Sequence, residues 1–142
     1  MATERPPIDR YPYVTPITTR WMDNDIYGHI NNVAYYSFFD TAANRFLIER
    51  GGLDIATATV IGLVVESRCE YHAPLAYPQG LRAGVRVDRL GNRAVTYGIA
   101  IFTEADDIAA AHGHFVHVFV DRASRQPVSI PGPLRAALET LV

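Results

Sequence analysis

The chain has 142 residues, of which 49% are hydrophobic and 20% charged, so it can bury a core and is not a disordered segment. A formal net charge of -2 argues against a general nucleic-acid binder, and no apolar run approaches the roughly 18–20 residues that span a bilayer. The N-terminus lacks the apolar region of a secretory signal, and the single cysteine, Cys69, excludes an internal disulfide. We therefore expect a cytoplasmic protein that binds neither nucleic acid nor membranes.

The first third of the chain predicts a strand, a polar loop and a long helix. Residues 1–12 are rich in proline and read as an extended lead-in, and the β-branched and aromatic residues of 13–21 favour a strand in which Pro16 indicates an edge position. After a polar loop, apolar side chains recur at helical spacing from Val33 to Arg50, and two glycines then end the helix.

The rest of the chain alternates with the period of two that is typical of strands. Strands are predicted over 63–72, 81–89, 93–104 and 108–121. In the first of these, Leu63, Val65, Cys69 and Tyr71 are expected to share one apolar face. The Gly91-Asn92 pair predicts a hairpin, and the tail over 131–142 can form a helix that starts after Pro133. The order predicts an α+β fold in one domain over 1–142, with a curved antiparallel sheet wrapped around one long helix.

The loop before the long helix carries more polar groups than a helix cap requires. It supplies Asp23 and Asp25, then Gly28, and then two asparagines at the helix start. A helix N-terminus presents unpaired backbone N–H groups that can polarise a carbonyl, and a nearby carboxylate can attack that carbonyl or activate water against it. Gly28 allows a tight turn and a close approach to a ligand.

The same residues also fit a purely structural interpretation. In that interpretation the aspartates bind loop amides, and Asn31 or Asn32 caps the helix. The spacing alone does not choose between a cap and a site for acyl transfer.

The segment DNDIYGHINNVAYYSFFDTA resembles the signature D-x-D-x-x-G-H-x-N-N-x-x-Y of the 4-hydroxybenzoyl-CoA thioesterase family. The signature positions are filled by Asp23, Asp25, Gly28, His29, Asn31, Asn32 and Tyr35, and the similarity continues through the later strands. The resemblance implies a hotdog fold and an acyl-CoA thioesterase, without a metal or other cofactor. The substrate is then an acyl-CoA or an acyl-carrier-protein thioester.

The resemblance also implies roles for single residues. Asp25 matches the catalytic carboxylate, as nucleophile or general base, and the amide of Asn32 matches the donor that polarises the thioester carbonyl. Asp23 is then expected to brace the loop. His29 matches a functional histidine of plant acyl-carrier-protein thioesterases, but Tyr27 stands where those enzymes have an asparagine, so His29 is expected to be an auxiliary polar group.

Further residues are expected to bind the substrate or to serve the structure. Tyr35 and Phe39 can line an acyl pocket as well as the core. Arg89 and Arg93 flank the hairpin, and the resemblance places phosphate-binding residues there, with Arg93 as the nearest match. Glu66 is expected on a solvated face.

The histidines of the last strand do not predict a metal site. His112 and His114 should share one face of that strand while His117 points to the other. Cys69 is expected to be a small buried hydrophobe rather than a nucleophile.

Family members pair their sheet edges as dimers with active sites at the interface, so we expect a homodimer or a homotetramer. Two other functions stay open from the sequence. A hotdog hydratase or dehydratase would also hold an acyl thioester, and a non-catalytic protein would bind acyl-CoA without turnover.

Overall fold

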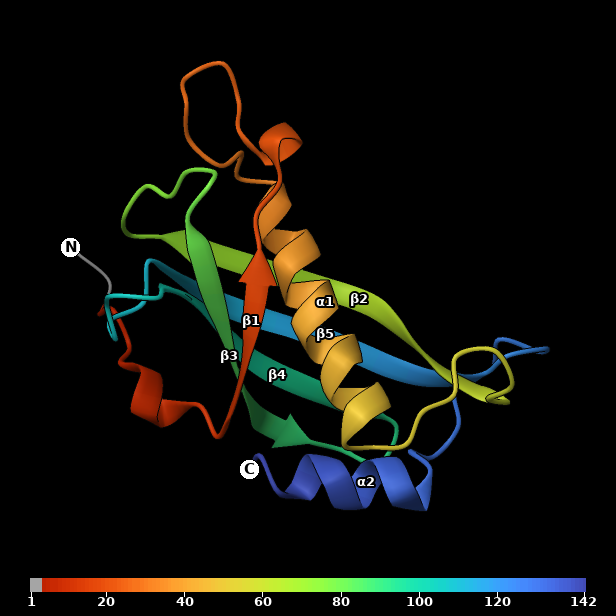
Figure 1. The fold of residues 1–142 in the computed structure, drawn as a ribbon. Helices are drawn as coiled ribbons and strands as arrows, with labels where there is room; N and C mark the ends of the chain where they lie inside the picture. Colours follow the sequence, from red (N-terminus) through yellow and green to blue (C-terminus); the bar gives the residue numbers. More distant parts are fainter. Residues whose placement is uncertain (1–3) are drawn as a thin grey trace.

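The computed structural model describes residues 4–142. Within them, the strands β1 (Tyr13–Thr18), β2 (Val60–Tyr71), β3 (Gly80–Leu90), β4 (Ala94–Thr103) and β5 (Ala111–Asp121) form an antiparallel sheet in the order β1-β3-β4-β5-β2. Helix α1 (Ala34–Glu49) lies across one face of the curved sheet, and the shorter α2 (Gly132–Glu139) lies beside the β3–β4 end (Figure 1). This arrangement is the predicted α+β hotdog fold.

Helix α1 forms where the apolar spacing predicts it and packs its buried side chains into the main core. Its buried side chains recur three and four residues apart, so they form one stripe against the sheet; they are Tyr35, Phe38, Phe39, Ala42, Ala43, Phe46 and Leu47. The sheet contributes every second residue of β3 and β4, such as Val85 and Ile99, which are fully buried. Gly52 ends the helix with a φ of +70°, a conformation that favours glycine.

The predicted hairpin is confirmed, and a helix forms in the C-terminal tail. The hairpin at Gly91-Asn92 joins β3 and β4, and the N–H of Gly91 donates to the carbonyl of Ala94 at 2.8 Å. The predicted C-terminal helix also forms, but it begins at Gly132 rather than after Pro133. No helix within residues 4–142 is both long and apolar enough to pass through a bilayer.

The N-terminal predictions are only partly correct. Strand β1 lies at the edge of the sheet, as Pro16 indicated, but it ends at Thr18. Trp21 instead begins the 3-10 helix η2 (Trp21–Asp23), because the backbone turns into the loop that follows. The expected extended lead-in contains another 3-10 helix, η1 (Ile8–Arg10), and residues 1–3 of that lead-in lie outside the described residues.

The prediction of one continuous apolar face along β2 is wrong. The ladder between β2 and β5 shifts register between Val64 and Glu66, where β2 carries a bulge. Because side chains alternate along a strand, the extra residue sends Leu63 to the outer face while Cys69 and Tyr71 face α1. The bulge also leaves the middle of this edge strand with exposed hydrophobic side chains.

On β5 the predicted faces are confirmed. His112 and His114 lie opposite Glu70 and Arg68 on the outer face. His117 is 1% exposed on the inner face, where its Nδ1 lies 3.1 Å from the hydroxyl of Tyr97. Burial lowers the pKa of His117 to about 4, so its imidazole is neutral.

Candidate active site

Asp23 braces the loop between β1 and α1. Its side chain is buried and accepts hydrogen bonds from the backbone N–H of Arg20 at 2.8 Å and from the guanidinium Nη2 of Arg20 at 2.9 Å. The carbonyl of Asp23 accepts from the N–H of Asn31 at 2.8 Å, which closes the base of the loop. The carboxylate of Asp23 is therefore engaged away from the reacting groups, as expected.

Asp25 opens a tight turn at the tip of the same loop. The N–H of Gly28 donates to the carbonyl of Asp25 at 3.1 Å, and Gly28 has the positive φ of +81° that favours glycine. Oδ1 of Asp25 accepts from the N–H of Tyr27 at 2.8 Å, which fixes the carboxylate, while Oδ2 has no hydrogen-bond partner among residues 4–142. Asp25 thus holds its own turn, as the structural interpretation requires, and keeps one oxygen for a ligand.

The start of α1 presents an unused backbone donor. Oδ1 of Asn31 accepts from the N–H of Val33 at 3.3 Å, which covers one of the exposed amides at the helix start. The N–H of Asn32 donates to no group within the described part of the chain. The carbonyl of Asn32 accepts from the hydroxyl of Tyr71 at 3.0 Å, so this peptide is tied to the end of β2.

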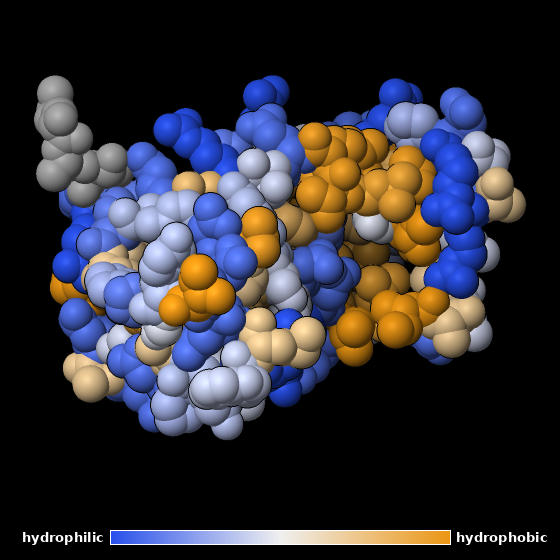
Figure 2. Space-filling view, turned by 90° about the horizontal axis from the view of Figure 1, so that it is seen from above, coloured by the Kyte–Doolittle hydropathy of each residue, from blue (hydrophilic) through white to orange (hydrophobic). Residues whose placement is uncertain are grey.

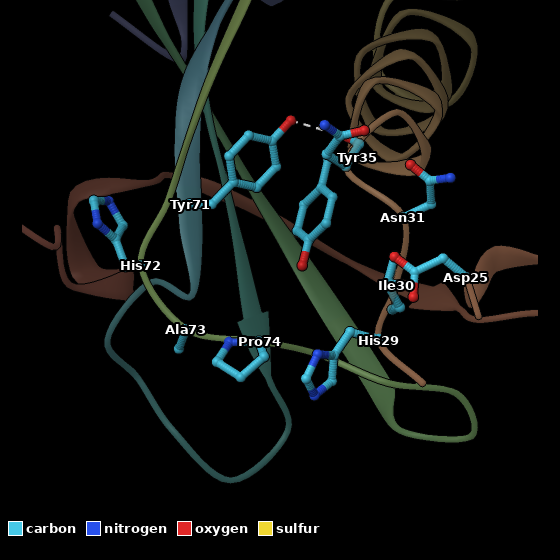
Figure 3. A pocket seen from close by; sticks show the side chains of 10 residues that line it. Asp25, His29, Ile30, Asn31, Tyr35, Tyr71, His72, Ala73 and Pro74 are labelled. Carbon is cyan, nitrogen blue, oxygen red and sulfur yellow. Dashed lines mark hydrogen bonds between the residues drawn. The ribbon is translucent and has the colours of Figure 1, made fainter. Parts of the chain in front are cut away.

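These groups border one cleft of about 480 Å³ (Figure 3). Its lining residues are Asp25, His29, Ile30, Asn31, Asn32, Tyr35, Tyr71, His72, Ala73 and Pro74. The carboxylate of Asp25 is directed toward the space between Tyr35 and His29, whereas the ring of His72 points away from that space (Figure 3). His72 instead contacts His112 on the outer face, with 2.7 Å between Nε2 and Nδ1.

The segment after β2 forms the second wall of the cleft and is fixed to the loop. The N–H of Ile30 donates to the carbonyl of Leu75 at 2.7 Å, and the N–H of Tyr77 donates to Oδ1 of Asn24 at 3.0 Å. Both bonds join residues that are more than forty positions apart in the sequence. The position of Asp25 therefore depends on the sheet as well as on its own loop.

Aromatic and sulfur groups beside the cleft are held in their neutral forms. Burial raises the pKa of the Tyr35 phenol to about 12 and that of the Cys69 thiol to about 11. Burial also raises the pKa of Tyr71. Cys69 is therefore a thiol packed against the core, in line with its expected structural role.

The structure brings together most of the predicted site residues and leaves one apart. Asp25, His29, Asn32 and Tyr35 share the cleft, and Gly28 shapes the turn beside it. Arg93 lies in a second groove of about 500 Å³.

The two sites lie at opposite ends of the sheet. Tyr71 pairs with Ala111 and Ala94 pairs with Val118, seven residues along β5. At about 3.3 Å per residue, the ends are separated by roughly 23 Å, so within one chain Arg93 does not border the cleft. The sequence placed both in one substrate site because it does not reveal which strand ends meet.

Other predicted residues have defined partners. Glu66 lies on the exposed outer face, as predicted, and lines the groove of Arg93, but Nε2 of His114 lies 2.6 Å from its Oε1. Tyr71 was not selected as a site residue from the sequence. Its only sequence signal is its place at the end of a strand, on the same face as Cys69.

The cleft combines the minimum requirements of acyl transfer. It contains a carboxylate oxygen and a backbone N–H without partners among the described residues, the latter at the positive end of a helix dipole. Such a donor stabilises the oxygen of a carbonyl that is attacked, and the carboxylate can attack or deprotonate water.

Comparison with known proteins gives a consistent result. A model of the thioesterase-like superfamily matches residues 19–138. The crystal structure of the PA5185 protein from Pseudomonas aeruginosa PAO1 is 59% identical, with a TM-score of 0.95 and 96% of each chain covered. The long-chain acyl-CoA thioesterase FadM of Escherichia coli is 25% identical over 129 residues, which cover 90% of this chain and 98% of FadM. The 1,4-dihydroxy-2-naphthoyl-CoA thioesterase Slr0204 from Synechocystis is 15% identical and shares the fold, with a TM-score of 0.80 over 91% of this chain and 96% of Slr0204.

Proposed function

The chain belongs to the thioesterase-like superfamily of hotdog-fold thioester hydrolases, and we propose that it cleaves an acyl-CoA with Asp25 as its catalytic carboxylate. The observation that carries this proposal is the pairing in one cleft of the Asp25 carboxylate with the unpartnered N–H of Asn32. Either group alone is common at a loop before a helix. Together they are suited to the two atoms of a thioester carbonyl that change most during attack.

In the proposed reaction, the thioester oxygen accepts a hydrogen bond from the N–H of Asn32. Asp25 then attacks the carbonyl carbon, or takes a proton from a water molecule that attacks it. The new carbon–oxygen bond replaces the carbon–sulfur bond, the thiolate leaves as coenzyme A, and it takes up a proton. After direct attack, water hydrolyses the acyl-enzyme to the same carboxylic acid. These steps need no metal and no redox cofactor.

The other residues of the cleft have supporting roles in this proposal. Gly28 gives the loop its turn, His29 is an auxiliary polar group at the mouth, and Tyr35 forms a wall of the acyl site. Tyr71 positions the Asn32 peptide through the hydrogen bond to its carbonyl. We place Tyr71 among the positioning residues because it acts through Asn32.

We also propose that the chain forms a homodimer through β2, alone or within a tetramer of such dimers. Among residues 4–142, β2 pairs with a strand on one side only, and its middle exposes Leu63, Val64 and Val65 to the extent of 38%, 46% and 61%. Hydrophobic side chains gather along this side of the molecule (Figure 2). A long apolar edge strand favours pairing with a second copy, which satisfies its free backbone groups.

Such a dimer supplies a role for Arg93. Antiparallel pairing of two β2 strands sets the Val60 end of one copy beside the Tyr71 end of the other. The groove of Arg93, which lies at the Val60 end of the sheet, then approaches the cleft of the second copy. Arg93 can there bind the phosphates of a coenzyme A whose thioester lies between the copies.

The substrate proposal is tested by measuring thiol release from a panel of acyl-CoA thioesters and matched acyl-carrier-protein thioesters. We expect release from at least one acyl-CoA, at a rate well above that of the buffer. A folded, pure protein that releases no thiol from any acyl-CoA in the panel contradicts the proposal, and exclusive release from carrier-protein thioesters contradicts its coenzyme A part.

A further inference from the structure

The hydroxyl of Tyr35 has no hydrogen-bond partner within the described part of the chain and reaches the cleft. The residue is 3% exposed, and its O–H makes no hydrogen bond with any of residues 4–142. Once a bound ligand covers this hydroxyl, leaving it unpaired costs free energy. Figure 3 shows this hydroxyl directed into the cleft that holds Asp25, so a ligand or water is the partner available to it.

Tyr71 provides an internal comparison. It lines the same cleft, and its ring meets the ring of Tyr35 edge to face, with 5.0 Å between centroids and 86° between planes. The hydroxyl of Tyr71 is already committed to the carbonyl of Asn32 at 3.0 Å. The two neighbouring phenols therefore differ in the use of their hydroxyls, because the O–H of Tyr35 is free for a ligand and that of Tyr71 serves the protein; Tyr71 is also the more exposed residue.

The position of Tyr35 on the helix sets what its hydroxyl can reach. Side chains in the first turn of a helix lean toward the N-terminus, so the Tyr35 ring extends past the helix start. In Figure 3 its hydroxyl lies at the end of the ring remote from the helix, among His29, Ile30 and Pro74. The N–H of Asn32 lies at the helix itself, so the two donors meet different parts of a bound substrate.

The wall around the Tyr35 hydroxyl also constrains the substrate. Ile30 and Pro74 beside it are apolar, and the neutral phenol offers one donor and an acceptor. A purely hydrocarbon acyl group placed here would displace water from the hydroxyl and leave it unpaired, whereas an acyl group with its own oxygen would replace that water. A site of this kind is suited to discriminate between acyl groups by one oxygen atom.

We propose that the Tyr35 hydroxyl binds an oxygen of the acyl group, so that the enzyme prefers acyl thioesters whose acyl part carries a hydroxyl or oxo group. This inference rests on the proposed acyl-CoA thioesterase function and names the substrate class of that same cleft. Tyr35 is in this view a specificity residue that touches substrate, and the reacting carbonyl is left to Asn32 and Asp25.

The test uses acyl-CoA pairs that differ by one oxygen. The pairs are benzoyl-CoA with its ortho-, meta- and para-hydroxy derivatives, and hexanoyl-CoA with β-hydroxyhexanoyl-CoA and β-oxohexanoyl-CoA. For each substrate, kcat/KM for thiol release is measured for the wild type and for Tyr35→Phe. The Kd is measured by calorimetry in the Asp25→Asn background, again with Tyr35 intact and with Tyr35→Phe. Tyr71→Phe is the matched control, because it removes the neighbouring hydroxyl that serves the protein.

We expect the wild type to prefer the oxygenated member of at least one pair by about tenfold or more in kcat/KM, the range set by leaving a buried hydroxyl unpaired. Tyr35→Phe should reduce that preference to about twofold or less, chiefly by lowering kcat/KM for the oxygenated member. Tyr71→Phe should lower kcat/KM for both members by the same factor, so that the preference is retained.

Two outcomes overturn the inference. One is a wild type that favours no oxygenated member in either rate or Kd. The other is a Tyr35→Phe variant that slows all substrates by the same factor, which would place the hydroxyl at the thioester common to them. Absence of thiol release with every substrate would instead refute the thioesterase proposal, and the Kd values would still decide the role of Tyr35.

Discussion

The buried pair of His117 and Tyr97 should make the stability of the fold depend on pH. His117 is 1% exposed on the inner face of β5, and burial lowers its pKa from 6.5 to about 4. The unfolded chain therefore binds a proton at this histidine at a higher pH than the folded chain does. Consequently the stability from the neutral imidazole is complete above about pH 6.5 and is lost as pH falls toward about pH 4.

The size of this effect follows from the pKa difference. At about 1.4 kcal/mol per pKa unit, the shift of His117 makes the free energy of unfolding about 3 kcal/mol smaller at pH 4 than at pH 7 through this residue alone. The assay is urea unfolding, followed by circular dichroism, at several pH values across this window. Other groups also titrate there, so the comparison is between the wild type and His117→Asn, which does not titrate and keeps an acceptor for the Tyr97 hydroxyl.

In His117→Asn, the loss of stability between pH 7 and pH 4 should be about 3 kcal/mol smaller than in the wild type, even if the variant is less stable at both. His114→Asn is the control, since His114 lies on the same strand but on the outer face beside Glu66. An equal acid-induced loss in the wild type and in His117→Asn would refute the reasoning.

Two further changes test the proposed assembly and the role of Arg93. Val65→Lys should convert the dimer to a monomer in sedimentation, because it places a charge on the β2 edge. Val14→Lys, on the opposite edge strand, should leave the dimer intact. An unchanged mass of Val65→Lys would show that β2 does not form the interface. Arg93→Ala should raise KM about tenfold for acyl-CoA but not for the matching N-acetylcysteamine thioester, which lacks phosphates. The control Arg10→Ala should change neither KM. Equal effects of Arg93→Ala on both thioesters would contradict phosphate binding.

Local patterns predict most of the fold. The buried stripe of α1 follows from apolar spacing between Val33 and Arg50, and the hairpin follows from the Gly91-Asn92 pair. The β2 bulge escaped prediction because the strand begins with an apolar run over 60–65 that fits either face, and only the pairing with β5 reveals the shift.

The sequence predicted the part of the candidate site that lies in one local motif and missed the parts that depend on how distant segments meet. Asp25, His29 and Asn32 lie within eight consecutive residues, so one motif contains them. Tyr71 lies 39 positions after Asn32, and its hydrogen bond depends on how the end of β2 meets the helix start. Arg93 was grouped with the site from the resemblance, yet it lies at the far end of the sheet and reaches a cleft only in the dimer that we propose.

The central claim is that Asp25 provides the catalytic carboxylate, and the value of kcat/KM for Asp25→Asn tests it most directly. The substitution keeps the size of the side chain and an oxygen for the N–H of Tyr27 but removes the charge. With the acyl-CoA that the wild type cleaves best, we expect kcat/KM to fall by about 10²–10⁴-fold, while the exposed control Asp9→Asn retains the wild-type value. An Asp25→Asn variant that hydrolyses the same substrate at the wild-type rate would contradict the claim.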